Sequence, residues 1–221
     1  DLLRLITLFR EIRMKTIRYI LITIALMIGF TASAQNGSTQ EQFERELKLK
    51  NESVSSIKCH FIQTREMSVL QNVVRKEGTF YFQRPGNMLL SFNDGDYIKM
   101  TEEWFEMKTG ENTTTTKISS NPMLRNLSTI LSACVVGDFA QMIRGFSIQV
   151  QSQAKQWVVI MTPQRGKAAS KISQIVLHFD RETMSLNTLK MVEKSGDYTM
   201  YGFSNKQFNV AIDSKLFKIE E

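Results

Sequence analysis

The chain has 221 residues, with 28 lysines and arginines against 22 aspartates and glutamates, and a formal net charge of +6 at pH 7. Half of this excess lies in the first 34 residues, so the remainder is too weakly basic to form the phosphate-binding stripe of a nucleic-acid-binding protein. Two histidines and two cysteines are too few for a zinc cluster or a disulfide-rich scaffold.

The N-terminal segment is typical of an export signal. Lys15 and Arg18 precede a mostly apolar stretch over residues 19–30, and Ala32-Ser33-Ala34 follows it. A short basic region, an apolar core and an A-x-A triplet together predict a secretory signal peptide. The apolar stretch is also shorter than the ~20 residues that a membrane-spanning helix needs.

This pattern sets the expected domain boundaries. We expect a signal peptide over residues 14–34, cleaved before Gln35, with residues 1–13 as an upstream extension. No cysteine follows the apolar core, so no lipid-attachment site is expected there. Residues 35–221 are then expected to form a single soluble domain that is exported to the periplasm.

The exported part is expected to begin with a helix and continue as a strand. Either Ser38-x-x-Glu41 or Thr39-x-x-Gln42 can act as a capping box, which predicts a helix that runs to about Val54. Residues 57–64 then alternate, with Ile57, Cys59 and Phe61 on one face. This alternation predicts a half-buried strand.

Further runs of period two, separated by turn sequences, predict an antiparallel meander of roughly eleven strands. The runs cover residues 78–83, 88–92, 97–101, 104–108 and 113–118, and then 146–151, 156–162, 172–180, 185–193, 198–203 and 208–212. Between the two sets, Pro122 at a first helical position and Gly137 after an apolar stripe predict a helix. A second short helix is expected over residues 138–144.

The histidines and cysteines, which are common catalytic residues, do not form a pattern that is typical of an enzyme. His60 neighbours Cys59 on a strand, so their side chains point to opposite faces and cannot form a nucleophile–base pair. His178 lies in the middle of a strand, where a solvent-facing or hydrogen-bonded role is the better interpretation. Cys59 and Cys134 are either two small buried hydrophobes or one disulfide, and the sequence leaves this open. With no catalytic or nucleotide-binding motif present, we expect no catalytic residue, no cofactor and no metal.

Several strands carry bulky apolar groups on both faces. Phe80 and Phe82 are expected on one face of their strand and Tyr81 on the other. In the next strand, Met88, Leu90 and Phe92 are expected on one face and Leu89 on the other. A sheet with one face in water should be polar on that face. Either these strands lie between a helix layer and a sheet, or the sheet curves around an apolar ligand.

A set of short motifs resembles the outer-membrane lipoprotein carrier protein family. The motifs are Phe61-x-Gln63, then Gly78-x-Phe80-x-Phe82-x-Arg84-Pro85, Trp104, Asn121-Pro122 and Asp213-Ser214-Lys215-Leu216-Phe217. Their order and spacing match the family over about residues 40–218. The resemblance implies an α+β, mainly β fold: a half-open, strongly curved antiparallel barrel of about eleven strands, with an N-terminal helix and an inserted helical lid.

The resemblance also implies a site. Arg84 stands where the family has an arginine that holds the lid closed by hydrogen bonds, and the lid here would cover residues 122–144. The residues expected to face an acyl-chain cavity are Phe80, Phe82, Met88, Leu90, Phe92, Leu124, Leu127 and Leu131.

The function implied by the resemblance is that of a soluble, monomeric periplasmic carrier. Such a carrier receives acylated lipoproteins from an inner-membrane lipoprotein-releasing transporter, shelters their acyl chains, and passes them to an outer-membrane acceptor. The lack of a cysteine after the signal favours the carrier over the lipidated acceptor. A lipid-sensing or regulatory module, or a glycolipid-binding protein on the same fold, is the alternative.

Overall fold

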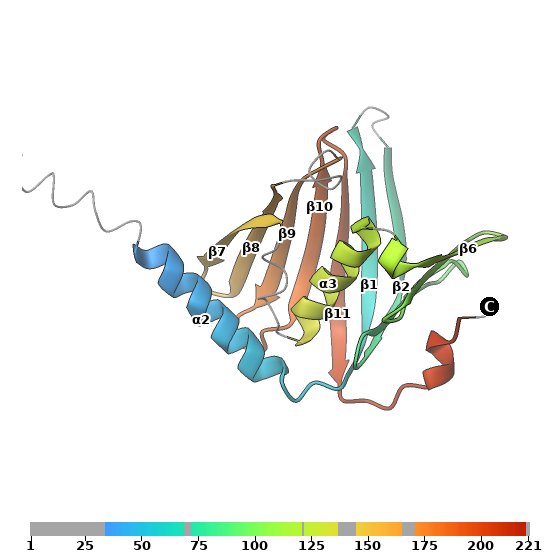
Figure 1. Ribbon diagram of the computed structural model, residues 1–221, viewed down its shortest axis with the longest axis horizontal. Helices are drawn as coiled ribbons and strands as arrows, with labels where there is room; N and C mark the ends of the chain where they lie inside the picture. Colours follow the sequence, from blue (N-terminus) through green and yellow to red (C-terminus); the bar gives the residue numbers. More distant parts are fainter. Residues whose placement is uncertain (1–33, 69–71, 121, 137–144, 165–170, 220–221) are drawn as a thin grey trace, which may run out of the picture. The chain divides into compact units, whose positions relative to one another are not determined.

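A computed structural model of the chain describes residues 34–68, 72–120, 122–136, 145–164 and 171–219 (Figure 1), and it describes no side chains for residues 34–38, 122–127 and 136. The chain divides into two compact units, Asp1–Thr39 and Gln40–Glu221. Of the first unit only residues 34–39 are described, as the first part of a helix. The fold and the site presented below belong to the second unit.

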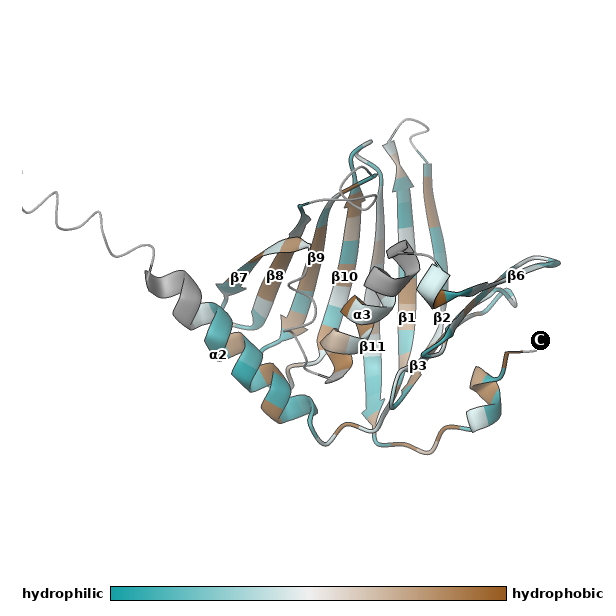
Figure 2. Ribbon diagram, viewed as in Figure 1, coloured by the Kyte–Doolittle hydropathy of each residue, from teal (hydrophilic) through white to brown (hydrophobic). Residues whose placement is uncertain are grey.

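Helix α2 spans Ala34–Asn51, so it begins before the predicted capping box and ends three residues before Val54. Its side chains are mostly hydrophilic (Figure 2), and Gln40 donates to Glu44 over 2.9 Å on this polar surface. Phe43 and Leu47, one turn apart, are fully buried. The spacing of four residues places them on one side of the helix, which is the side that packs against the sheet.

Eleven strands form one antiparallel sheet, as predicted, and the sheet curls without closing into a barrel (Figure 1). The strands are β1 (Ser56–Met67), β2 (Asn72–Gln83), β3 (Asn87–Phe92), β4 (Tyr97–Met100), β5 (Trp104–Thr109), β6 (Asn112–Lys117), β7 (Phe146–Ser152), β8 (Gln156–Pro163), β9 (Ile172–Asp180), β10 (Leu186–Glu193) and β11 (Tyr198–Phe208). The separate strand predicted over residues 208–212 is wrong. Phe208 ends β11, and the carbonyl of Val210 instead accepts a hydrogen bond from the Ser56 hydroxyl over 2.6 Å.

The strand order is β6-β5-β4-β3-β2-β1-β11-β10-β9-β8-β7. Each half is a meander of neighbouring strands, and the two meanders join where β1 pairs with β11. Phe61 of β1 lies opposite Phe203 on one side and Gly78 on the other. The first and last strands therefore meet in the middle of the sheet, and β6 and β7 form its two edges.

Helix α3 spans Pro122–Val136 and confirms the helix predicted between the two sets of strands. It lies across one face of the sheet (Figure 1). Ile130, Ala133 and Cys134 are its buried described side chains. The short helix predicted over residues 138–144 lies outside the described residues.

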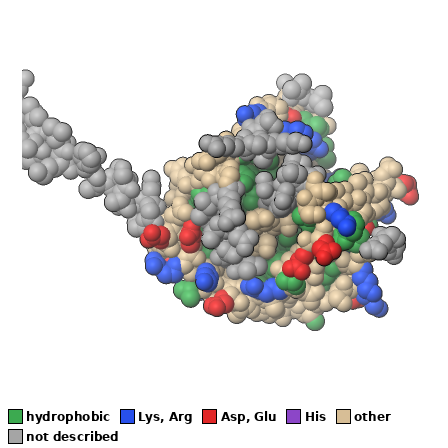
Figure 3. Space-filling model, in the orientation of Figure 1, with side chains coloured by type: hydrophobic (Ala, Val, Ile, Leu, Met, Phe, Trp, Pro, Cys, Tyr) green, Lys and Arg blue, Asp and Glu red, His purple; other side chains and the backbone are tan. Residues whose placement is uncertain are grey.

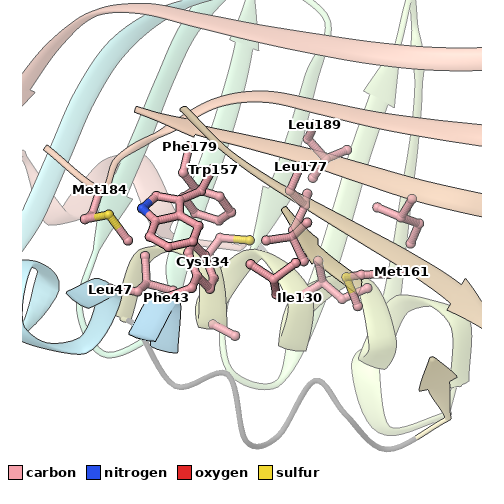
Figure 4. Close-up of a cluster of buried hydrophobic side chains, with 14 of the residues drawn as sticks. Phe43, Leu47, Ile130, Cys134, Trp157, Met161, Leu177, Phe179, Met184 and Leu189 are labelled. Atoms are coloured by element: carbon pink, nitrogen blue, oxygen red, sulfur yellow. The ribbon is translucent and has the colours of Figure 1, made fainter. Parts of the chain in front are cut away.

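Two clusters of buried side chains hold the helices to the sheet. The α2-side core contains Phe43, Leu47, Ile130, Ala133, Cys134, Phe146, Val150, Trp157, Val159, Met161, Ile175, Leu177, Phe179, Met184 and Leu189 (Figure 4). The β1-side core contains Val54, Ile57, Cys59, Phe61, Phe80, Phe82, Met88, Leu90, Phe92, Met100 and Ile118. Three partly buried residues, Leu131, Tyr201 and Phe203, pack against both cores.

Both cysteines are free and buried, Cys59 on β1 and Cys134 on α3. Burial raises the pKa of each thiol to about 12. Of the two sequence-based alternatives, the small buried hydrophobe is therefore confirmed.

The chain closes with a short 3-10 helix, η4 (Ser214–Phe217), which packs near β3. The Asp213 carboxylate accepts from the backbone N–H of Lys215 over 2.9 Å, and the ring of Phe217 is buried. The Lys99 ammonium donates to the carbonyl of Lys218 over 2.5 Å. In the motif over residues 213–217, Asp213 therefore caps the start of η4, and Phe217 anchors the helix by its buried ring.

Candidate functional site

Strand β11 lies in the middle of the sheet, yet none of its eleven residues is fully buried. A central strand covered by a helix is ordinarily the best-packed part of a sheet. Tyr201 and Phe203, which share one face of β11, instead lie between the two cores and are only partly covered. The junction of the two cores at β11 is therefore where packing under α3 is incomplete.

Two small apolar cavities occupy this junction. The cysteine cavity, of about 40 Å³, is lined by Asn51, Ile57, Cys59, Phe80, Leu131, Cys134, Val135, Ser185, Leu186, Phe203, Lys206 and Phe208. The methionine cavity, of about 50 Å³, is lined by Phe80, Leu90, Ile98, Met100, Leu131, Leu189, Met191, Tyr201 and Phe203. Phe80, Leu131 and Phe203 belong to both linings, so three side chains separate two neighbouring spaces.

The cavities are too small for an acyl chain as they stand. Pockets that bind drug-sized ligands measure ~300–1000 Å³, whereas these two measure about 40 and 50 Å³. Leu131 is the one shared lining residue that comes from α3. The size of both cavities therefore depends on how closely α3 packs against the sheet.

Three of the residues predicted to face an acyl-chain cavity line one or both of these small cavities, and their role in acyl-chain binding stays a prediction. Phe80 and Leu131 line both cavities, and Leu90 lines the methionine cavity. Phe82, Met88 and Phe92 are buried in the β1-side core and do not line either cavity. The side chains of Leu124 and Leu127 lie outside the described residues.

The sequence prediction missed the contribution of β10 and β11. Leu189 and Met191 on β10, together with Tyr201 and Phe203 on β11, form one wall of the methionine cavity. The two members of each pair are two positions apart in the sequence, which places them on a common strand face. The two-residue periodicity of these strands could have identified their apolar face. Only the pairing of β11 with β1, however, brings this face beside Phe80.

Arg84 binds the end of α2. Its Nε donates to the carbonyl of Val54 over 2.5 Å, and its Nη2 donates to the carbonyl of Asn51 over 2.9 Å. Carbonyls at a helix C-terminus lack partners within the helix, and a cation is favourable there. Part of the predicted lid, residues 137–144, lies outside the described residues, so the role of Arg84 as a lid latch stays a prediction.

Comparison with known proteins assigns the family. The sequence model of the family described as outer membrane lipoprotein carrier protein LolA matches residues 52–220 of the chain. The chain belongs to the LolA family. The match begins directly after α2 and includes every strand and α3, and therefore most of the lining of both cavities.

Solved structures with a similar fold are distant in sequence. A LolA superfamily protein from Nitrosomonas europaea is 10% identical, with 80% of this chain and 97% of that chain covered and a TM-score of 0.41. The lipoprotein LppX of Mycobacterium tuberculosis is 12% identical, with 77% and 95% covered and a TM-score of 0.42. LprF from Mycobacterium bovis is 13% identical, with 80% and 95% covered and a TM-score of 0.40. No curated protein matches the chain.

Neither histidine of this LolA-family chain lines the cysteine cavity or the methionine cavity. The Nδ1 of His60 lies 3.4 Å from the Ser204 hydroxyl, and the Nδ1 of His178 lies 3.1 Å from Oε1 of Gln156. Burial lowers the pKa of His178. Within the described ranges, no group of three or more His, Cys, Asp or Glu side chains is placed to hold a metal ion.

The described surface is of mixed charge. On the face shown in Figure 3, acidic and basic side chains are interspersed. Among the described helices, none combines the length and apolar character needed to cross a membrane.

Proposed function

We propose that this LolA-family chain is a periplasmic carrier that shelters the acyl chains of lipoproteins and moves them from the inner to the outer membrane. The observation that carries the proposal is the incompletely covered central strand β11, with two neighbouring apolar cavities between it and α3. An apolar space beneath a single helix can be enlarged by moving that helix. Under this proposal the chain acts by binding and not by catalysis.

The hydrophobic effect determines what a carrier must offer to an acyl chain that leaves the membrane. Each methylene taken out of the membrane costs ~0.8 kcal/mol, so a lipoprotein with several acyl chains leaves the bilayer only for comparable apolar surroundings. Phe80, Leu131 and Phe203, together with Met100 and Met191, offer such surroundings. Methionine side chains repack easily around ligands of variable shape.

The partners follow from the same proposal. A donor at the inner membrane, a lipoprotein-releasing transporter, hands over the acylated lipoprotein, and an acceptor at the outer membrane takes it up. The export signal expected over residues 14–34 and the single domain expected over residues 35–221 support a monomeric carrier that travels between them.

The test measures release of an acylated peptide from vesicles. Phosphatidylethanolamine vesicles that contain a fluorescent triacylated lipopeptide are incubated with the protein and sedimented. We expect the protein to carry lipopeptide into the supernatant. Leu131→Trp, which places a large ring at the boundary of both cavities, should abolish most of this release. The matched control is Leu49→Trp, because Leu49 is 67% exposed on α2.

The outcomes separate the candidate functions. Release by the wild type and by Leu49→Trp, but not by Leu131→Trp, supports the carrier. A protein that binds lipopeptide at the vesicle surface without releasing it would be a sensor or regulatory module. Selective release of a glycolipid in place of the lipopeptide would point to the glycolipid carrier.

A further inference from the structure

We propose that the cysteine cavity contains a carboxylate-binding site, formed by Asn51, Ser185 and Lys206, which holds the head of a long-chain fatty acid whose tail lies between α3 and the sheet. This inference rests on the proposed function and names a ligand for the same cavity. Asn51, Ser185 and Lys206 are polar residues in an otherwise apolar lining, and the Lys206 ammonium donates to the Ser185 hydroxyl over 3.0 Å.

Asn51 provides a donor that has no partner. Its side chain is only 4% exposed, and within the described part of the chain its Nδ2 finds no hydrogen-bond acceptor. Buried amide groups are nearly always hydrogen-bonded, and an exception calls for a reason such as an absent ligand. Asn51 lines the cysteine cavity while its Nδ2 is covered, so a rotation of the side-chain amide would present this donor to an oxygen atom of a ligand there.

Lys206 provides a cation with neutral partners. Its ammonium donates to the Ser185 hydroxyl over 3.0 Å and to Oδ1 of Asn187. Lys206 forms no ion pair with any carboxylate that the structure describes. Burial lowers the pKa of Lys206, although Cys59 and Asp180 oppose this shift. A partly buried ammonium with only neutral acceptors is stabilised by an anion that enters beside it.

Ser185 completes the site. It is 7% exposed and precedes β10, and its hydroxyl lies 2.8 Å from that of Thr183 as well as 3.0 Å from the Lys206 ammonium. The three residues come from the end of α2, the turn before β10 and strand β11. The fold therefore brings them together from distant parts of the sequence.

The pattern of the lining indicates the class of ligand. One ammonium, one amide and one hydroxyl suit a head group with a single negative charge and two oxygens. Phe80, Leu131 and Phe203 line both this cavity and the neighbouring methionine cavity. A linear hydrocarbon chain with a carboxylate at one end fits both features. An acyl ester offers the same carbonyl oxygen without the charge, so the test compares the two sources.

The experiment is calorimetric titration of the delipidated protein with three C16 ligands below their micellar concentrations: palmitate, methyl palmitate and hexadecanol. We expect palmitate to bind about tenfold more tightly than hexadecanol, with the ester between them, because charge-assisted hydrogen bonds are the stronger ones. Lys206→Met and Asn51→Leu should each remove most of this preference without weakening hexadecanol binding. Lys58→Met removes a charge from an exposed side chain of β1 and should change nothing.

Each outcome decides one question. Equal binding of palmitate and hexadecanol by the wild type overturns the carboxylate site and leaves the carrier standing. A preference for the ester over palmitate overturns it as well and assigns the polar residues of the cavity to esterified chains. Absence of binding for all three ligands contradicts the proposed function itself. If Lys206→Met does not fold, as judged by circular dichroism, Asn51→Leu decides, because Nδ2 of Asn51 has no partner to lose among the residues that the structure describes.

Discussion

Gly78 allows β2 and β3 to approach one another. A Cβ at this position would lie 2.0 Å from the Ser91 carbonyl oxygen and 2.8 Å from the Cα of Phe92. Gly78 also lies in register between Phe61 and Phe92, whose rings meet edge to face at 5.1 Å. Gly78→Ala should destabilise the protein by about 1–3 kcal/mol, because the contact atoms belong to the backbone and must move. Urea unfolding measures this change.

Gly202 on β11 is the matched control for Gly78→Ala. A Cβ there meets nothing within 4 Å. Gly202→Ala should leave the free energy of unfolding unchanged or raise it slightly, since alanine restricts the unfolded chain. Equal losses in the two variants would show that strand glycines matter here for a reason other than the close approach of β3.

Lys76 links the turn between β3 and β4 to β2. Its ammonium lies 2.8 Å from Asp94 Oδ2 and 2.5 Å from Asp96 Oδ2. The hydrogen bond from Lys76 is the main cause that lowers the pKa of both carboxyl groups. A lowered pKa means that the unfolded chain binds protons more readily than the folded one. The stabilisation is therefore present above the ordinary pKa of 3.8 and is lost as the pH falls through the lowered values.

The prediction for Lys76 is a difference that depends on pH. Lys76→Met should be less stable than the wild type at neutral pH, and the gap should shrink below about pH 4 as the two carboxyl groups become protonated. Thermal unfolding of both proteins across this range measures the gap. A gap of constant size down to the lowest pH would assign the effect to packing of the lysine stem on the Phe92 ring, whose centroid is 5.6 Å from Nζ.

At the scale of elements, α2 is held to the sheet mainly by aromatic contacts. The Phe43 ring lies 5.5 Å from the ring of Trp157 and 5.2 Å from that of Phe179 (Figure 4). Phe43→Ala should cost about 3–5 kcal/mol, as for other large-to-small core changes. Leu49→Ala, at an exposed position of the same helix, should stay within about 0.5 kcal/mol of the wild type. Guanidinium unfolding checks both, and a small loss for Phe43→Ala would mean that α2 docks by other contacts.

Local patterns predicted most elements but not their full lengths. The alternation of apolar and polar residues predicted β9 with its observed limits. Pro122 and Gly137 correctly predicted where α3 begins and ends. Strand β1 continues to Met67 beyond its predicted end at Thr64, through Arg65 and Glu66, which carry no apolar alternation. Their backbone pairs with β2 and β11 on both sides, and such ladder contacts come from distant parts of the chain. The apolar run at residues 208–212 failed for the converse reason, because β1 begins at Ser56 and its pairing with β11 ends at Phe208.

The candidate site was predictable where one strand or helix carried the signal. Phe80, Leu90 and Leu131 stand in bulky apolar patterns and line the cavities. Asn51 and Lys206 are ordinary polar residues in the sequence, 155 positions apart. Their role emerges only because β11 pairs with β1 beside the end of α2. Contacts of that range leave no trace in local periodicity.

At the scale of the whole domain, the two cores give α3 a double attachment. Ile130, Ala133 and Cys134 pack in the α2-side core, while Leu131 also touches the β1-side core. Between the cores lies β11, where burial is incomplete. Because Phe43 and Leu47 of α2 share a core with Cys134, loosening the end of α2 should also loosen α3. Arg84, which binds the carbonyls at that end, is therefore placed to affect closure.

The rate at which Cys134 is alkylated measures how tightly α3 is closed over the sheet. Its thiol is buried with a pKa of about 12, so at about pH 8 alkylation by iodoacetamide requires α3 to move, since the thiolate is the reactive form. In a Cys59→Ser background, Arg84→Leu should speed labelling of Cys134 several-fold. Gly78→Ala, which destabilises the β2–β3 pair without touching the end of α2, separates local opening from general loss of stability. Labelling of Arg84→Leu at the wild-type rate would remove the latch role, and equal acceleration by Gly78→Ala would assign the effect to global unfolding.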